Sequence, residues 1–399
     1  MTVRAGREFL SIPGPTTVPD EVLSAMHRPA VDIYSGGLVD ITTSLLDDLR
    51  TLFATKGRTY IYASNGHGVW EAALGNVLSR GDRVLVLESG RFATSWGDMA
   101  ARMGALVDVL PGEYQRAVRP AEVAERLAAD TAHAIKAILL TQIDTASGVA
   151  NDVAAIAAAA RSVGHPALVM VDTVASLACM PFEMDAWGID VAVAGSQKGL
   201  MTPPGLGLIA AGERAVAAHP TADLVTPYWD WTAREGPEHY QKYCGTPPEH
   251  LLFGLRKAID MLMAEGLDNA YQRHRLLAGA TQAAVERWSQ GGVLGFNVEE
   301  SGERAVSVTT VRWRESEDSG QALQALTAYA RERCGVVLGK GIGALGGKAF
   351  RIAHMGHVNA PMLLGTLGVV EMALKALKVP HGSGGIEAAV EYLAARVEP

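Results

Sequence analysis

Two stretches of the sequence decide the fold, Ala167-Leu-Val-Met-Val-Asp172 and Asp190-Val-Ala-Val-Ala-Gly-Ser-Gln-Lys198. In each, a run of small or branched apolar residues leads to a charged residue. Runs this apolar are typical of parallel strands that are buried on both faces of a sheet. Because ligands of open α/β sheets bind beyond the carboxyl ends of the strands, we expect Asp172 and Lys198 to face one crevice.

Similar apolar runs lie on both sides of these two stretches, and helix candidates without internal proline separate several of them. This alternation predicts an α/β fold in which helices cover both faces of a seven-stranded, mostly parallel sheet. The strand candidates are residues 59–64, 83–89, 105–110, 135–142, 167–172, 190–195 and 207–211, and the helix candidates are residues 69–78, 94–102, 121–129 and 153–163.

The pattern changes after residue 211. Residues 219–248 contain prolines and tryptophans with little periodicity, which predicts a long surface excursion. Two helices separated by Gly266 follow at 250–265 and 267–290, and strand and helix candidates then alternate in a smaller α+β domain. The predicted division is an N-terminal arm (1–20), a large domain (21–266), and a linking helix with the small domain (267–399). The late strands are expected at 305–313, 335–338 and 349–355, and the late helices at 321–333, 361–377 and 385–396.

Composition excludes several classes of protein. Of the 399 residues, 48% are hydrophobic and 20% are charged, unlike a disordered chain. The formal net charge of -8 and the lack of a basic stripe argue against a nucleic-acid partner. The sequence contains neither an apolar run of about 18 residues nor a signal peptide, so we expect no membrane span. Three widely spaced cysteines argue against a disulfide framework and favour a cytoplasmic location.

Two motifs near the C-terminus match cofactor or metal patterns only in part. Gly341-Ile-Gly-Ala-Leu-Gly346 has the spacing of a dinucleotide fingerprint, but a predicted strand follows it where the fingerprint requires a helix. His354 and His357 have a metal-ligand spacing without a third ligand nearby. We therefore expect neither a dinucleotide nor a metal.

A third motif complements Asp172 and Lys198. Ser64-Asn-Gly-His-Gly-Val-Trp-Glu71 lies between a strand and a helix candidate, where the N–H groups of a helix N-terminus can hold a phosphate. A lysine, a carboxylate and an anion cradle around one crevice suit pyridoxal phosphate (PLP). The lysine would bind the cofactor aldehyde, and the carboxylate would keep the pyridine nitrogen protonated.

Together with Ile12-Pro-Gly-Pro15, Phe350-Arg-Ile-Ala-His-Met-Gly356 and Gly382-Ser-Gly384, these motifs resemble the class V aminotransferases, in particular the serine–glyoxylate and alanine–glyoxylate group. The resemblance spans nearly the whole chain. It implies PLP fold type I and a homodimer with active sites at the interface. It also implies a ping-pong transfer of an amino group from a small amino acid, serine or alanine, to a 2-oxo acid, glyoxylate.

The resemblance further implies roles for individual residues. Lys198 and Asp172 would be catalytic, because Lys198 would form the Schiff base and Asp172 would pair with the pyridine nitrogen. Arg351 would hold the substrate α-carboxylate with its forked guanidinium. The other expected cofactor contacts are Gly66, His67 and Gln197 around the phosphate, Val174 beneath the ring, Phe92 stacked on it, Thr145 at the ring oxygen, and Tyr243 and Thr246 reaching the phosphate in a second subunit.

One element departs from the family pattern. Where many serine–glyoxylate members have Tyr-Arg-Ser-Pro, this chain reads Asp32-Ile-Tyr-Ser-Gly-Gly37, so Tyr34 replaces an arginine at the expected substrate entrance. A neutral hydroxyl on an aromatic ring favours small neutral donors. A nearby base, Arg28 or Arg91, would reverse that preference. Aspartate, ureidoglycine and pyridoxamine therefore stay open as alternative donors.

Two other functions are compatible with a PLP site. A lyase or cysteine desulfurase needs a mobile nucleophilic cysteine, but Cys179 and Cys334 lie in apolar sequence and Cys244 lies beside the predicted phosphate segment. A PLP-binding regulator or inactive scaffold is disfavoured, because neither a DNA-binding helix pair nor a basic extension occurs. The intact set of Lys198, Asp172 and Arg351 favours catalysis.

Overall fold

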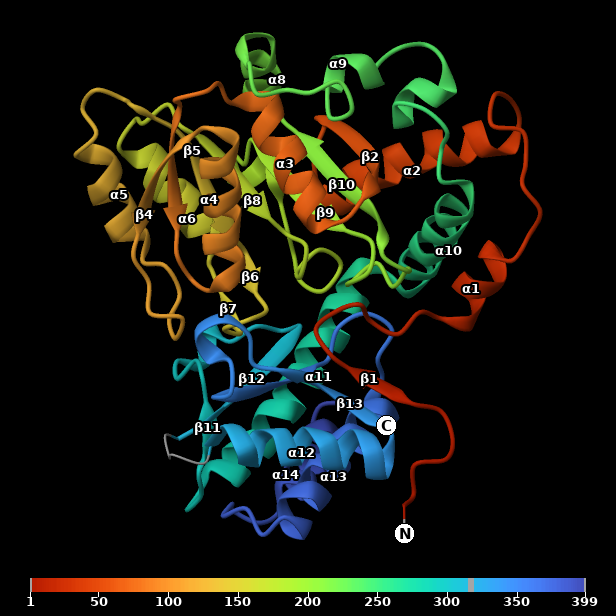
Figure 1. The fold of residues 1–399 in the computed structure, drawn as a ribbon, viewed down its shortest axis with the longest axis vertical. Helices are drawn as coiled ribbons and strands as arrows, with labels where there is room; N and C mark the ends of the chain where they lie inside the picture. The colour runs from red at the N-terminus through yellow and green to blue at the C-terminus, as the bar shows by residue number, and fades with distance from the viewer. Residues whose placement is uncertain (1, 315–318, 398–399) are drawn as a thin grey trace.

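The computed structural model describes residues 2–314 and 319–397. Within these residues, all seven predicted strands form one seven-stranded sheet, here called the large sheet (Figure 1). Only β10 runs antiparallel to its neighbours in this described sheet, so the predicted fold class is confirmed. In spatial order the strands are β2 (Arg58–Ser64), β10 (Gly205–Ala211), β9 (Val191–Gly195), β8 (Leu168–Asp172), β5 (Ile135–Thr141), β3 (Arg83–Leu87) and β4 (Leu106–Leu110).

The central strands explain why this sheet is buried on both faces. Every residue of β8 and β9 is buried. Val169 and Val171 of β8 join the apolar core on one face, whereas Leu168 and Met170 join the core on the other. This division follows from the two-residue period of a strand. Both cores therefore need a covering layer of helices.

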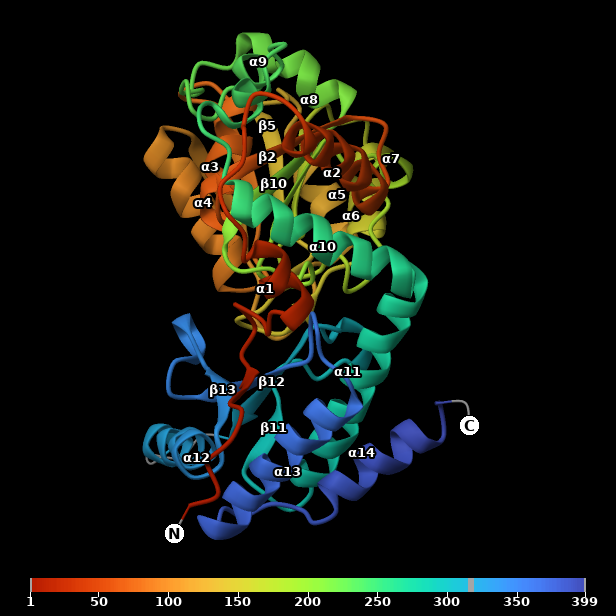
Figure 2. The same ribbon diagram turned by 90° about the vertical axis from the view of Figure 1, so that its right-hand side faces the viewer.

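Helices supply that layer on both faces (Figure 2). α3 (Gly66–Val77) and α4 (Arg91–Met103) pack on one face, and α2 (Gly37–Phe53), α5 (Pro120–Ala128), α6 (Val153–Ser162) and α10 (Glu249–Glu265) pack on the other. α3 and α4 begin earlier than the sequence predicts because polar side chains cap them. Asn65 caps α3, and Asp144 accepts hydrogen bonds at the start of α4. The shorter helices are α1 (Asp20–Met26), α7 (Met184–Trp187), α8 (Glu213–Ala218) and α9 (Trp231–Arg234).

A second sheet, here called the small sheet, has five strands among the described residues and lies at the other end of the molecule (Figure 1). Its first strand comes from the predicted N-terminal arm (residues 1–20). Phe9 in this strand pairs in parallel with Val336, so the arm is part of the small sheet. In spatial order its strands are β1 (Phe9–Ser11), β13 (Val336–Lys340), β14 (Ala349–Ala353), β12 (Val308–Trp313) and β11 (Leu294–Phe296). Its helices are α11 (Leu267–Ser289), α12 (Ser319–Cys334), α13 (Ala360–Ala376) and α14 (Gly385–Ala394).

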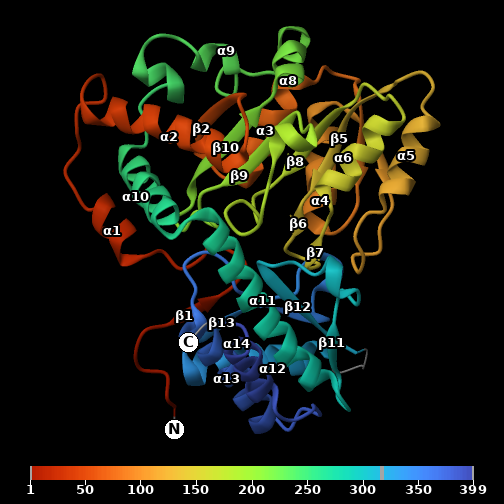
Figure 3. The same ribbon diagram turned by 180° about the vertical axis from the view of Figure 1, so that it is seen from behind.

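The two sheets are joined by α10 and α11, which meet at Gly266 (Figure 3). Gly266 has a φ of 84°, a conformation that favours glycine. Across this junction, Arg273 forms an ion pair with Glu265 at 2.6 Å and donates a hydrogen bond to the carbonyl of Gly356. The predicted boundary at residue 266 coincides with this bend, and the domain division itself stays a prediction.

Residues 219–248 form a long segment at the surface, as the sequence predicts, but helical turns and a few buried side chains hold it in place. They form helical turns at His219–Thr221, Trp231–Arg234 and His239–Tyr243, and they bury Trp231, Arg234 and Tyr243. Arg234 donates a hydrogen bond to the carbonyl of Ile61 in the edge strand β2 and stacks on the ring of Tyr62 at 3.9 Å. These anchors contact distant elements, so they leave no local periodicity in the sequence. No helix in the described residues is both long and apolar enough to cross a membrane.

Candidate active site

A cavity of about 290 Å³ opens where β8 and β9 end. Asp172 is the last residue of β8, and Lys198 follows the adjacent strand β9. The crevice predicted from these two strand ends is therefore present. The cavity also brings together most of the predicted cofactor contacts, namely Gly66, His67, Phe92, Thr145, Val174 and Gln197.

The Asp172 carboxylate is buried, and both of its oxygens accept hydrogen bonds. The indole N–H of Trp70 donates to Oδ2 at 3.1 Å, and the N–H of Val174 donates to Oδ1 at 2.7 Å. Burial raises the pKa of Asp172 to about 7, and these hydrogen bonds oppose the rise. A cationic partner in the cavity would favour the ionised carboxylate, as the assigned role requires.

Lys198 lies against the N-terminal segment of the chain. Its Nζ donates a hydrogen bond to the carbonyl of Pro13. Burial and the positive charge of Arg351 lower the pKa of Lys198 to about 8, so about a tenth of the amine is neutral at about pH 7, far more than for an ordinary lysine. Gly14 makes this approach possible, because it has a φ of 118° and any Cβ there would lie 2.5 Å from Cε of Lys198.

The turn at the start of α3 is the predicted phosphate cradle. Asn65 Oδ1 accepts hydrogen bonds from the N–H groups of His67 and Gly68, so these two donors are engaged within the chain. Gly66 faces Val174 closely, since a Cβ at Gly66 would lie 3.3 Å from Cγ2 of Val174. Small residues thus keep this end of the cavity open.

Gln197 provides a test of whether the cavity suits PLP. Its Oε1 atom is buried and has no hydrogen-bond partner among the described residues. A buried amide without a partner is costly, and a polar ligand in the cavity would satisfy it. Together with a lysine and a carboxylate at neighbouring strand ends, this amide fits a cofactor that carries an aldehyde, a pyridine nitrogen and a phosphate.

Aromatic side chains form one wall of the site. The His67 ring lies 4.6 Å from the ring of Trp70, and Phe92 lies 6.4 Å from Trp70 in an edge-to-face arrangement. Trp96 stacks on the far side of Trp70 at 5.9 Å. Burial, with a contribution from Arg91, lowers the pKa of His67, which favours its neutral form. The wall is therefore apolar and suited to a flat ring.

Arg351, on β14 of the small sheet, does not line this cavity, but it is hydrogen-bonded to Thr145, which does. Its Nε donates to the carbonyl of Lys340 at 2.8 Å, and its Nη1 donates to the carbonyl of Thr145 at 3.0 Å. Burial lowers the pKa of Arg351 to about 10, which still leaves it charged at neutral pH. Its positive charge also lowers the pKa of Lys198, which lines the cavity. The site thus lies between the two sheets.

Tyr34, Tyr243 and Thr246 do not line this cavity. Tyr34 is 70% exposed and packs edge-to-face with Tyr240, with ring centroids 6.4 Å apart. Tyr243 is buried, and its hydroxyl is hydrogen-bonded to that of Thr42 at 2.7 Å. Thr246 is exposed. Their assigned roles at the entrance and in a second subunit stay predictions.

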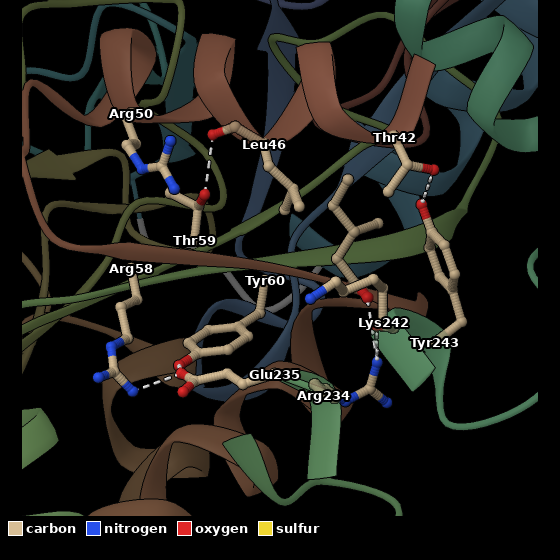
Figure 4. A pocket seen from close by; sticks show the side chains of 11 residues that line it. Thr42, Leu46, Arg50, Arg58, Thr59, Tyr60, Arg234, Glu235, Lys242 and Tyr243 are labelled. Atoms are coloured by element: carbon tan, nitrogen blue, oxygen red, sulfur yellow. Dashed lines mark hydrogen bonds and ion pairs between the residues drawn. The ribbon is translucent and has the colours of Figure 1, made fainter. Parts of the chain in front are cut away.

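Tyr243 instead lines a second cavity of about 320 Å³ beneath α2 (Figure 4). Its arginines are engaged by protein groups. Arg58 pairs with Glu235, and Arg234 donates to backbone carbonyls. This cavity contains none of the other predicted site residues.

Sequence reasoning missed Trp70, which lines the cavity, and Asp144, which does not line it but accepts a hydrogen bond from the N–H of Phe92. Trp70 lies within the quoted motif and one helical turn after Gly66, so the helical spacing was a usable signal. Asp144 gave no such signal. Elsewhere, β14 follows Gly341–Gly346 as predicted, and the His354 ring is hydrogen-bonded to Thr309 and to the carbonyl of Val306.

Comparison with known proteins agrees with this geometry. Residues 9–337 match the family model described as aminotransferase class-V. The chain is 38% identical to the serine–glyoxylate aminotransferase of Methylorubrum extorquens, over 98% of this chain and 97% of that protein. It is 35% identical to the L-aspartate–glyoxylate aminotransferase of Paracoccus denitrificans, over 96% and 95%. The structure of pyridoxamine–pyruvate aminotransferase from Mesorhizobium loti matches with a TM-score of 0.88 at 26% identity, covering 100% of both chains. The chain therefore belongs to the class V aminotransferases, a family of PLP-dependent transaminases.

Proposed function

We propose that this enzyme transfers the amino group of a small amino acid, serine or alanine, to glyoxylate in a ping-pong cycle. The observation that carries the proposal is the meeting of Lys198 and Asp172 in one cavity beside the charge of Arg351. The serine–glyoxylate relative, which matches over nearly the whole of both chains, supports the choice of substrates.

Bound PLP supplies an electron sink for the electron pair that remains when the substrate α-proton leaves. Lys198 Nζ takes that proton, a task suited to an amine whose pKa is about 8. Asp172 holds the proton on the pyridine nitrogen through its carboxylate, which the Trp70 N–H keeps oriented. The same two side chains serve both halves of the cycle.

Arg351 orients the substrate. Two of its nitrogens are held by backbone carbonyls, while Nη2 makes no hydrogen bond to the described residues and is available to a carboxylate. A guanidinium fixed in this way binds the α-carboxylate shared by the amino acid and glyoxylate. One arginine therefore serves both substrates.

A desulfurase-type reaction is disfavoured by the cysteines. Cys179 is fully buried, and burial raises its pKa to about 12, so it is not a thiolate nucleophile. Cys244 is exposed and does not line the cavity. All three cysteines are unpaired, which supports a reducing, cytoplasmic location for the enzyme.

We also propose a homodimer in which Tyr243 and Thr246 contact the phosphate in the partner's site. The proposal is supported by their family motif and, for Thr246, by the exposure of its side chain. The exposed pair Tyr34 and Tyr240 offers apolar surface for a subunit contact. In such a dimer, Tyr34 would favour small neutral donors because it brings no positive charge.

The deciding experiment mixes the PLP-loaded enzyme with single amino acids and no acceptor, and follows conversion of the bound cofactor by visible absorbance. We expect serine or alanine to convert it, glyoxylate to restore it, and Tyr34→Arg to improve aspartate relative to serine. Conversion by aspartate or pyridoxamine alone would refute the proposed donors, and both compounds are named as substrates of relatives. An unchanged donor ranking in Tyr34→Arg would refute the role of Tyr34.

A further inference from the structure

A buried carboxylate lies behind the cavity without a role in the mechanism. Asp144 is the last residue of the short strand β6 (Ile143–Asp144), and it is 0% exposed. Its Oδ2 accepts hydrogen bonds from the N–H groups of Phe92 at 2.7 Å and Ala93 at 3.1 Å. Its Oδ1 accepts from the N–H of Ala146 at 2.9 Å. One side chain therefore ties the first turn of α4 to the turn that follows β6.

The first of these ties fixes Phe92. Its own N–H is bound by the carboxylate, and its ring lines the cavity beside Trp70. A carboxylate at a helix N-terminus also complements the positive end of the helix dipole. The backbone from which the ring projects therefore depends on Asp144.

The second tie fixes Arg351. The hydrogen bond to Ala146 holds the turn that contains Thr145, and the carbonyl of Thr145 accepts from Nη1 of Arg351. Arg351 belongs to the small sheet, whereas this turn belongs to the large-sheet part of the chain. The negative charge of Asp144 also raises the pKa of Arg351 against the effect of burial. Position and charge of the arginine are thus both linked to Asp144.

We propose that Asp144 is a positioning residue that sets the Phe92 ring against the cofactor and the Arg351 guanidinium against the substrate carboxylate. The part concerning substrate rests on the function proposed above for Arg351. The part concerning Phe92 rests only on the cavity and the cofactor.

Gly90 provides a way to move Asp144 without changing any charge. A Cβ at Gly90 would lie 2.2 Å from Cγ of Asp144 and 2.4 Å from its Oδ1, a distance that forces the carboxylate to shift. Gly90→Ala and Asp144→Asn should therefore produce the same defect by different routes. Gly302→Ala is the matched control, because a Cβ at Gly302 meets nothing within 4 Å.

The test measures the dissociation constant of PLP from the cofactor-free protein, the visible circular dichroism of bound PLP, and KM for amino acid and glyoxylate. We expect each of Gly90→Ala and Asp144→Asn to weaken PLP binding and raise both KM values by roughly tenfold, the effect of losing a hydrogen bond to a charged group. Gly302→Ala should match the wild type. Unchanged PLP affinity and KM in folded Gly90→Ala would overturn the proposal, even if Asp144→Asn merely unfolds.

A double variant tests whether Asp144 acts through the arginine. In the double variant Asp144→Asn/Arg351→Lys, KM should rise by less than the product of the increases in the two single variants. This is expected because Asp144 acts on KM through the position of Arg351. If the increases in KM multiply fully, Asp144 does not act through Arg351. If the wild-type protein binds PLP but transfers no amino group, the proposed function is refuted. The role of Asp144 toward Phe92 can still be tested in that case, because it is measured by the PLP affinity and dichroism of Gly90→Ala.

Discussion

The hydrogen bond from Trp70 to Asp172 gives the sharpest prediction for cofactor binding. Trp70→Phe removes the indole N–H that donates to Oδ2 at 3.1 Å and keeps an aromatic ring in the wall. Because that N–H stabilises the ionised carboxylate, its loss should raise the pKa of Asp172 above its present value of about 7. The pyridine nitrogen of PLP needs the ionised form, so cofactor affinity should shift with it.

The size of the shift follows from the chemistry of the bond. A hydrogen bond to a buried charge contributes about 1.5–3 kcal/mol, which corresponds to roughly one to two pH units. Asp172 in the wild type is about half ionised at pH 7. In Trp70→Phe it would be mostly protonated at that pH, which weakens PLP binding by about tenfold. The assay is the PLP dissociation constant of the cofactor-free protein, titrated from pH 6 to about pH 9.

Trp96→Phe is the control, because Trp96 stacks on Trp70 and its indole N–H has no partner among the described residues. Both variants lose an indole from the aromatic wall of the cavity. Only Trp70→Phe should shift the pH midpoint at which PLP affinity rises. Free PLP titrates identically in every sample, so its own ionisation does not affect the comparison. A uniform loss of affinity with an unmoved pH midpoint would show that Trp70 acts by packing alone.

Three further predictions concern the dimer, the substrate and acid stability. Mixing Lys198→Ala with Thr246→Ala subunits should restore one intact site per heterodimer, and mixed dimers no more active than the parents would contradict the shared site. Arg351→Lys should raise KM for amino acid and glyoxylate by roughly tenfold with PLP affinity unchanged, and equal losses in both would argue against a substrate role. Burial lowers the pKa of His274 to about 4 and of His354 to about 3, so stability should be highest above about 6.5 and fall as pH decreases toward these values. The melting temperature should fall with decreasing pH in the wild type and fall less in His354→Gln. If the two curves of melting temperature against pH are parallel, the loss of stability comes from other groups.

The large sheet could be predicted because each of its strands carries its own signal. β9 is apolar along its whole length and β8 up to its last residue, and each leads to a predicted site residue, Lys198 or Asp172. Lys198 and Asp172 could therefore be paired before any contact was known. The amphipathic helix α2 was not among the predicted helices, although Leu45, Leu49 and Leu52 recur at helical spacing and are buried.

Other parts of the site depend on contacts that sequence patterns do not encode. Asp144 acts on the N–H of Phe92, which lies 52 residues earlier, and needs the missing side chain of Gly90. Neither residue is unusual in its local sequence. The three-residue strand β1 is too short to show a period, and its partner β13 lies near the other end of the chain. Tyr243 belongs to a motif that the sequence identifies, but its position depends on packing against Thr42.

The strand β1 has a consequence for attempts to divide or trim this protein. The segment that begins at Phe9 completes the small sheet, and within a few residues it supplies the carbonyl of Pro13 to Lys198 and the N–H of Thr16 to the carbonyl of Gln197. A truncated protein that lacks these residues would lose both a strand and a contact of the Lys198 amine. An excised fragment of residues 267–399 would leave β13 as a bare edge, open to pairing with other copies. The parts of the chain around the large and the small sheet therefore cannot be separated cleanly, because the residues near the N-terminus contact both.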